Sequence, residues 1–394
     1  MSRVLVGIQR RKVPMSGRDP DEEHRAATPL ELFFDLTFVV AVAFAAQGLH
    51  HSLLEGDIGE GVFDYAIVFF AIWIAWLNFT WFASAYDVDD VQYRITTMVQ
   101  IAGALILAAG IPRGMADDDF AIGVTGFIVM RLAMVTQWLR VAYSDPPRRK
   151  MAVRFAIGIT VAQAFWITRL IAGTNLWWLF VGGGIVELLV PVWAESVARS
   201  PWNFHHIVER YGLFNIIMLG ESVLAATIAF QVALDAGSGD VALLTLAISG
   251  VLVVFSMWWL YFDHPKHRFI DRTRTAFAWG YGHLFIFGAA AAVGVGIEAA
   301  IDYKTDHSSL TQVQTGLVVA IPVAIYVLGV WWLHGLRHMR GYLNIAFPVA
   351  AGIVVAAGLT PAALHLTALT LVALVVLVVA EMPNLERDAA SHGA

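Results

Sequence analysis

Glu221 is an acidic residue that the sequence places inside a membrane-spanning stretch, where a charged side chain is energetically costly. It lies well inside the stretch 206–230, which is about as long as one membrane crossing and carries Glu209 and Arg210 near its start. On insertion scales a charge at the centre of the bilayer costs roughly 2.5–3.5 kcal/mol, so it must find a partner, a proton or a water-filled cavity. We therefore predict that Glu221 takes part in binding or transport.

Arg131 poses the same problem with the opposite charge. It falls near the middle of the apolar stretch 119–143, where reaching an interface would require about 15–18 Å at 1.5 Å per residue. It therefore needs a buried anion, and the candidates are Glu187, Glu221 and Asp35. A static ion pair between helices and a pair that exchanges partners or protons during transport both remain open.

Asp35 and Glu31 lie near the start of the first apolar stretch. Thr28, Pro29 and Glu31 have the spacing of a helix start with a capping box, which favours a structural role for Glu31. Asp35 lies one turn deeper on the same face, beyond the cap. It is predicted either to line a polar pathway or to pair with a basic residue of the cytoplasmic rim.

Further candidates lie at His283 and at the cytoplasmic rim. His283 is well inside the stretch 275–298, where its ordinary pKa near 6.5 suits proton handling, although a hydrogen-bonded structural histidine is the favoured interpretation. The acidic run 87–90, with Asp87 and Asp90, is predicted to pair with the basic loops after the fourth and eighth spans, or else to gate an inner vestibule. No metal site is expected.

The composition defines the class of protein. Of 394 residues, 58% are hydrophobic and 14% charged, against about 25% charged in soluble domains, so the chain is predicted to be an integral membrane protein. The absence of cysteine excludes disulfides, thiolate metal sites and a thiol nucleophile. No P-loop, dinucleotide fingerprint or HExxH motif is present, so no cofactor is expected and an enzyme is not favoured.

Twelve apolar windows are each long enough to span about 30 Å of hydrocarbon. They lie near 30–50, 62–82, 95–112, 119–143, 151–172, 176–196, 206–230, 241–262, 275–298, 311–333, 341–359 and 362–380. With the N-terminus inside, most Lys and Arg residues face the cytoplasm, and the exceptions are Arg113, Arg131, Arg169 and Lys304. The fold class is therefore all-α, a polytopic helix bundle of about twelve spans with both termini cytoplasmic.

A faint internal repeat suggests two six-helix halves of the same orientation, as in transporters with parallel repeats. The run 76–79 resembles 259–262, and Arg94 and Arg274 both precede a third span. The alternative is that Trp and Arg merely mark interfaces. The predicted organisation is a polar tail 1–27, halves 28–200 and 201–383, and a tail 384–394.

Three motifs resemble the bacterial low-temperature-requirement protein A (LtrA) family: residues 28–40, 86–90 and 209–222. The resemblance extends from about Thr28 to Pro383 and implies a multi-spanning protein of the bacterial inner membrane, but no substrate. The motif positions are Glu31, Asp35, Asp87, Asp90, Glu209, Arg210, Gly220 and Glu221. More remotely, Phe34-Asp35 is similar to the Phe-Ser-Asp motif of lysosomal-type potassium channels, with Phe in place of Ser.

The leading hypothesis is a secondary transporter of a small solute, with proton coupling as an option. Its central polar site would contain Asp35, Arg131, Glu187 and Glu221. The alternatives are a cation channel, or a non-transporting protein that binds lipid or acts as a sensor. The expected partners are membrane lipids and a small solute or ion, the proton included; nucleic acid is not expected, and a homodimer is left open.

Overall fold

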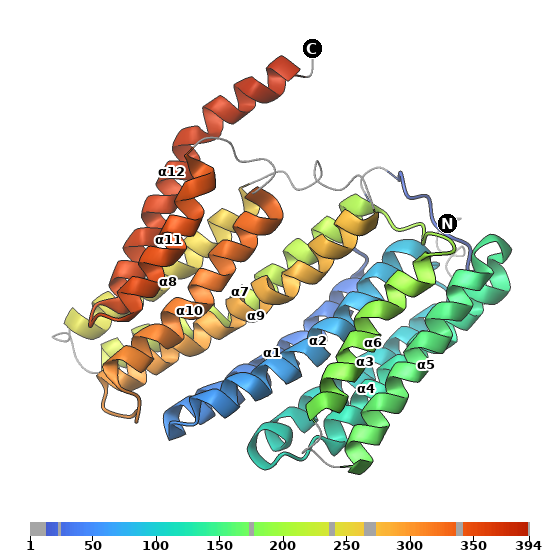
Figure 1. The fold of residues 1–394 in the computed structure, drawn as a ribbon, viewed down its shortest axis with the longest axis horizontal. Coiled ribbons are helices and arrows are strands. Elements are labelled where there is room, and N and C mark those ends of the chain that lie inside the picture. The colour runs from blue at the N-terminus through green and yellow to red at the C-terminus, as the bar shows by residue number, and fades with distance from the viewer. Residues whose placement is uncertain are drawn as a thin grey trace, which may run out of the picture. The chain divides into compact units, whose positions relative to one another are not determined.

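The computed structural model describes residues 13–22, 25–172, 177–235, 241–263, 273–335 and 342–392. In this part of the chain the regular elements are helices, and no β-strand occurs. The α-helices (Figure 1) are α1 (Pro29–Glu55), α2 (Ile58–Tyr86), α3 (Val91–Asp117), α4 (Ala121–Ser144), α5 (Arg149–Ala172), α6 (Trp177–Glu195), α7 (Phe204–Asp235), α8 (Val241–Phe262), α9 (Thr273–Lys304), α10 (Gln312–Val330), α11 (Leu343–Gly358) and α12 (Ala363–His392). A 3-10 turn (Pro146–Arg148) precedes α5, and a π-helical turn (Trp331–Gly335) follows α10.

All twelve apolar windows form helices. Eleven of the described helices are long and apolar enough to cross a membrane, and α11 is shorter, with 16 residues. At 1.5 Å per residue α11 extends about 24 Å, less than the hydrocarbon thickness. The all-helical class and the membrane character are thus confirmed, whereas the number of spans, the internal repeat and the orientation of the termini stay predictions.

The chain divides into two compact units. Unit 1 contains Met1–Ala45 and Ile67–Tyr211, and unit 2 contains Ala46–Ala66 and Gly212–Ala394. Helices α1, α2 and α7 therefore contribute residues to both units. The predicted halves, 28–200 and 201–383, are not tested by this division.

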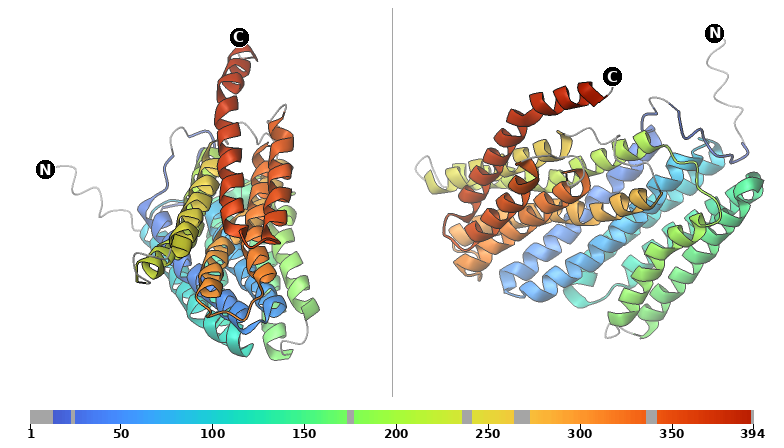
Figure 2. Two further views of the ribbon diagram at one scale, coloured as in Figure 1. Left: turned by 90° about the vertical axis from the view of Figure 1, so that its left-hand side faces the viewer. Right: turned by 45° about the horizontal axis from the view of Figure 1, so that its top comes forward.

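Within unit 1, α3 packs against α4, α4 against α5, and α5 against α6 (Figures 1 and 2). Glycines bring α3 and α4 into backbone contact: a Cβ atom on Gly110 would collide with Gly123, and one on Gly126 would collide with the backbone of Gly103 and Leu107. This close approach determines which residues of the two antiparallel helices lie at the same level.

The described part of the N-terminal segment packs against the end of α2 and the start of α3. The amide of Val13 donates to Asp90 Oδ2 at 2.9 Å, and the amide of Arg18 donates to the carbonyl of Ala85 at 2.9 Å. Met15 is fully buried. Residues 13–22 therefore form part of unit 1.

Within unit 2, α9 packs against α10, α10 against α11, and α12 against both α8 and α11. A capping box starts α10: Thr311 Oγ1 accepts from the amide of Gln314, and Gln314 Oε1 accepts from the amide of Thr311 at 2.8 Å. Gly294 allows α7 to approach α9, because a Cβ at this position would lie 3.0 Å from the Glu221 carbonyl.

Candidate functional site

Asp35 forms the centre of a buried polar network in unit 1. Arg210 donates to both of its oxygens, from Nε to Oδ2 at 2.9 Å and from Nη2 to Oδ1 at 2.6 Å. Trp76 Nε1 donates to the same Oδ1 at 2.7 Å. All three side chains are almost fully buried. Such a two-pronged arginine–carboxylate contact is strong and geometrically specific.

Glu31 has two functions in this network. It closes the predicted capping box, since Thr28 N donates to Glu31 Oε2 at 2.8 Å and Glu31 N donates to Thr28 Oγ1 at 3.3 Å. Its other contacts are with Arg210 Nη1, 3.0 Å from Oε1, and with His206 Nε2 at 3.3 Å. The predicted cap is confirmed, and it also brings a carboxylate to Arg210.

The network holds more acidic than basic groups. Arg25 contacts the carbonyls of Ser84 and Ala83 and interacts electrostatically with Glu31 and Asp87. Burial and the nearby Glu31 raise the pKa of Asp87 to about 6. Glu31, Asp35 and Asp87 thus share two arginines, so the network holds one more carboxyl group than guanidinium groups.

Arg131 finds its anion in Glu187. The two side chains form a fully buried ion pair between α4 and α6. Gln163 Nε2 and Trp166 Nε1 of α5 each donate to Glu187 Oε1 at 3.3 Å. Of the three candidate anions, the structure therefore selects Glu187.

Two residues of the acidic run 87–90 form ion pairs, Asp90 with an arginine near the end of α4 and Asp89 with Arg94 of α3. Asp90 caps α3 by accepting from the amide of Tyr93 at 2.8 Å and forms an ion pair with Arg140 of α4. The Asp90 oxygens thereby accept from three donors, which lowers its pKa despite burial. The other basic loop proposed as a partner, residues 264–272, lies outside the described residues. Glu209 Oε1 accepts from the amide of Ala27 at 3.4 Å.

Unit 2 contains a pocket of about 320 Å³ that includes Glu221. We call this the acidic pocket; its polar lining residues are Gln47, His50, Glu221, Glu298 and Asp302. His50 Nε2 lies 2.7 Å from Asp302 Oδ2, and His50 Nδ1 lies 3.8 Å from Glu298 Oε2. The rest of the lining is mainly apolar: Ala46, Leu224, Ile228, Val232, Gly294, Val295 and Ile301.

His283 has the environment of a structural histidine. It is fully buried in α9. Its Nδ1 lies 2.8 Å from the carbonyl of Trp279, and its Nε2 lies 3.1 Å from Tyr261 Oη. Both ring nitrogens are therefore hydrogen-bonded.

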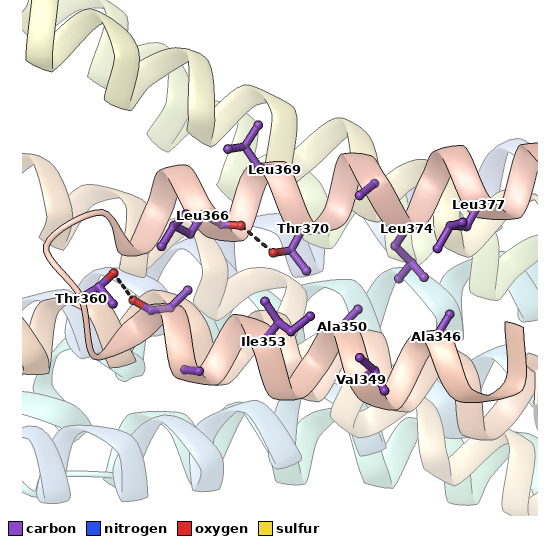
Figure 3. Close-up of a pocket in the computed structure, with 13 residues that line it drawn as sticks. Ala346, Val349, Ala350, Ile353, Thr360, Leu366, Leu369, Thr370, Leu374 and Leu377 are labelled. Atoms are coloured by element: carbon purple, nitrogen blue, oxygen red, sulfur yellow. Dashed lines mark hydrogen bonds between the residues drawn. The ribbon is translucent and has the colours of Figure 1, made fainter. Parts of the chain in front are cut away.

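A second hollow in unit 2 is apolar. A groove of about 610 Å³ runs between α11 and α12, and its walls are Ala, Val, Ile and Leu side chains apart from Thr360 and Thr370 (Figure 3). Both hydroxyls donate to backbone carbonyls, Thr360 to Ala357 at 2.8 Å and Thr370 to Leu366 at 2.7 Å. The groove thus offers no free donor to a ligand.

The structure distributes the predicted central site among different clusters. Asp35 pairs with Arg210, Arg131 pairs with Glu187, and Glu221 lies in the acidic pocket of unit 2. Sequence reasoning did not assign His206 to the network around Asp35, and of the polar residues of the acidic pocket it predicted Glu221 but not Gln47, His50, Glu298 or Asp302. The one available signal was on α9, where Glu298 and Asp302 are four positions apart and so share a helix face.

The described residues contain no group of three or more His, Asp or Glu side chains arranged to hold a metal ion. This includes the acidic pocket, whose carboxylates are spaced along α7 and α9. The chemistry that these clusters can perform is therefore ion pairing, proton binding and the binding of a cationic group.

The comparisons with known proteins identify the family. An uncharacterized protein of Rhizobium meliloti (strain 1021) is 26% identical over 267 residues, and the match covers 65% of this chain and 62% of that relative. The family described as bacterial low temperature requirement A protein (LtrA) matches residues 26–382. This confirms the resemblance seen in the three motifs. The chain is therefore a multi-pass membrane protein that belongs to the LtrA family.

Proposed function

We propose that the protein is a proton-coupled secondary transporter of a small organic cation, which binds in the acidic pocket of unit 2. The observation that carries this proposal is the grouping of Glu221, Glu298 and Asp302 around one hollow with a single histidine. A bacterial inner-membrane location with cytoplasmic termini is part of the same proposal.

The position of the acidic pocket along the helices suits a transport site. Glu221 lies near the middle of α7, whereas His50 is in the second-last turn of α1, and Glu298 and Asp302 are in the last turns of α9. The pocket therefore extends from the helix ends toward the middle of the spans. A solute entering from the ends would meet Glu221 last.

The lining favours a cation with an apolar body. Three carboxylates and one histidine leave an excess of negative charge, which repels anions and attracts cations. The side chains of Leu224, Ile228 and Val295 supply apolar contact. A volume of about 320 Å³ is at the lower end of the range for small-molecule sites.

Proton coupling follows from competition for the same carboxylates. A buried carboxylate takes up a proton when no cation neutralises it. A cationic solute that binds Glu221 would displace this proton, and the proton would return when the solute leaves. His50, held between Asp302 and Glu298, is a second exchangeable site in the pocket.

The test uses the purified protein in liposomes that contain a pH-sensitive dye. Quaternary ammonium ions, from tetramethylammonium to choline and tetraethylammonium, carry no exchangeable proton, so a pH change on their addition reports exchange by the protein. We expect saturable proton movement with at least one of them in the native protein and none with Glu221→Gln.

Glu55→Gln is the matched control. Like Glu221, Glu55 is a carboxylate. It lies at the end of α1, its side chain is 58% exposed, and it pairs with His51 outside the pocket. Its transport should equal that of the native protein. A current that rises in proportion to the concentration of the quaternary ammonium ion, without saturation or proton movement, would favour a cation channel. Transport unchanged in Glu221→Gln would refute the site assignment.

The apolar groove between α11 and α12 supports a second candidate, a non-transporting lipid-binding protein. A wall of aliphatic side chains fits an acyl chain (Figure 3). Mass spectrometry of the protein purified in detergent would reveal a retained lipid. Retention that is lost in Ala350→Trp, together with no flux of any quaternary ammonium ion, would favour this candidate over the transporter.

A further inference from the structure

Unit 1 contains a group of buried polar atoms that have no hydrogen-bond partner among the described residues. Each belongs to a side chain that is at least nine-tenths buried. The atoms are Tyr93 Oη, Thr97 Oγ1, Gln100 Nε2, Arg131 Nε, Gln137 Oε1 and Gln163 Oε1. Buried polar atoms in native proteins are almost always paired, with protein or with ordered water.

Three of these atoms lie on one face of α3. Tyr93, Thr97 and Gln100 are spaced four and three residues apart, as residues on one side of a helix are. The same buried face continues with Ala104, Leu107 and Ile111, which are apolar. The polar part of the face therefore ends at Gln100, about 10 Å along the helix from Tyr93.

The contacts between α3 and α4 show which part of α4 lies level with Gln100. Thr96 Oγ1 accepts from Gln137 Nε2 at 2.8 Å, and farther along α3 a Cβ atom on Gly103 would collide with Met130. Gln100 lies between these two contacts in the sequence. Since the helices are antiparallel neighbours, Gln100 is level with the part of α4 that carries Arg131.

The two ends of this group adjoin carboxylates. At one end, Tyr93 lies in the first turn of α3, directly after the acidic run 87–90, and its amide donates to Asp90 Oδ1 at 2.8 Å. At the other end, Arg131 pairs with Glu187, to which Gln163 also donates. We name the six side chains Tyr93, Thr97, Gln100, Arg131, Gln137 and Gln163 the polar track.

We propose that the polar track binds a file of ordered water molecules, and that this file gives the Glu187 carboxylate access to protons from the Asp87 end of unit 1. Water suits the track because it donates and accepts, whereas the unpaired atoms include donors (Gln100 Nε2, Arg131 Nε) and acceptors (Gln137 Oε1, Gln163 Oε1). The apolar positions beyond Gln100 close the far end.

The water file is independent of the proposed function, because the polar track lies in unit 1 and the acidic pocket in unit 2. The water file would exist whether or not the protein carries a cation. Absence of transport in the liposome assay would therefore not contradict the water file, and transport in that assay would not demonstrate it.

X-ray hydroxyl-radical footprinting of the full chain in detergent tests the water file. Bound water releases radicals on irradiation, which oxidise adjacent side chains even when these are buried. Met134 is 1% exposed and lies between Arg131 and Gln137 on the buried face of α4. We expect Met134 to be oxidised in the native protein and several-fold less in the double variant Thr97→Val, Gln100→Leu.

Thr136→Val is the matched control, because Thr136 is exposed on α4 and its hydroxyl donates only to the carbonyl of Leu132. Its Met134 oxidation should equal that of the native protein. If the double variant does not fold, Thr97→Val alone is compared with Thr136→Val. Met134 that stays unoxidised in the native protein, or is oxidised equally in all variants, would overturn the water file.

Infrared difference spectroscopy tests the access of protons to Glu187. In native protein transferred from H₂O to D₂O, we expect the guanidinium band that Arg131→Gln removes to shift rapidly, because the N–H protons that Arg131 holds against Glu187 exchange with the water file, and to shift several-fold more slowly in Thr97→Val. Equal exchange rates in Thr97→Val and Thr136→Val would refute the proton route through the polar track.

Discussion

Arg210 of α7 holds Asp35 of α1 through two hydrogen bonds, at 2.9 Å from Nε and 2.6 Å from Nη2. The third nitrogen of the same guanidinium, Nη1, lies 3.0 Å from Glu31. One cation thus neutralises two carboxylates that are one helical turn apart. The network is buried, so each of its charges depends on the others.

Loss of Arg210 should destabilise the protein strongly. Arg210→Ala leaves Asp35 and Glu31 buried without their cation, and breaking a buried pair in this way costs about 3–5 kcal/mol. Denaturant unfolding of the purified protein in detergent micelles measures the loss. Adding Asp35→Asn to Arg210→Ala should recover part of it, since one stranded charge is then removed.

Arg94→Ala is the control for this prediction. Arg94 also pairs with a carboxylate, Asp89, but both side chains are about half exposed. An exposed pair contributes at most about 1 kcal/mol. If Arg210→Ala were no more destabilising than Arg94→Ala, the network would not hold α1 and α7 together.

The helix start at Thr28 could be predicted from the sequence because its signal is local. Thr28, Pro29 and Glu31 are within one helical turn, so their spacing alone specifies the cap. The twelve helices were likewise predictable from apolar length. The pairing of Asp35 with Arg210 was not, because 175 positions separate the two residues and one sequence contains no information on which distant helices are neighbours.

The same reason explains the remaining differences at the site. A buried arginine such as Arg131 requires an anion nearby, and the sequence offered three candidates. The packing of α4 against α5 and of α5 against α6 identifies Glu187 as the partner. His50, Glu298 and Asp302 lie toward helix ends, where polar residues are common, so even the four-residue spacing of Glu298 and Asp302 did not indicate that they lie beside Glu221.

Ionisation of Asp87 should make the free energy of unfolding depend on pH between about pH 4 and pH 6. Burial and Glu31 raise the pKa of Asp87 from its ordinary value near 3.8 to about 6. The folded state therefore binds more protons in this range than the unfolded state, and the contribution of Asp87 to stability falls as the pH rises through it, by about 1.4 kcal/mol per pH unit at most.

Asp87→Asn should remove this dependence. The asparagine stays neutral, and its Oδ1 can still accept from the amide of Asp89, which lies 2.9 Å from Asp87 Oδ1. Relative to the native protein, the variant should gain stability from pH 4 to pH 6 and keep a constant difference above pH 7. A variant that loses relative stability over the same range would mean that Asp87 ionises more easily on folding, the opposite sign.

A double-mutant cycle at Arg131 and Glu187 should show strong coupling. Arg131→Gln and Glu187→Gln each leave one buried charge unpaired, at a cost of about 3–5 kcal/mol. In the double variant both charges are absent, so the sum of the single effects should exceed the double effect by at least about 1 kcal/mol. Additive effects in denaturant unfolding would mean that the two side chains do not form the pair.

Two glycine substitutions should have opposite effects on stability. At Gly126 a Cβ atom would collide with the backbone of α3, so Gly126→Ala should force α3 and α4 apart and destabilise unit 1 by about 1–3 kcal/mol. At Gly220, next to Glu221, a Cβ would meet nothing within 4 Å. Gly220→Ala should therefore stabilise α7 by about 0.5–1 kcal/mol, because alanine is the better helix former.

Gly220→Ala also tests why a glycine precedes Glu221. Since packing in this structure leaves room for a methyl group, any need for glycine must arise from motion or from an occupant. A variant that is more stable than the native protein but no longer exchanges protons for quaternary ammonium ions would locate that need in the transport cycle. A variant that is more stable and fully active would show that the transport cycle does not require a glycine at position 220.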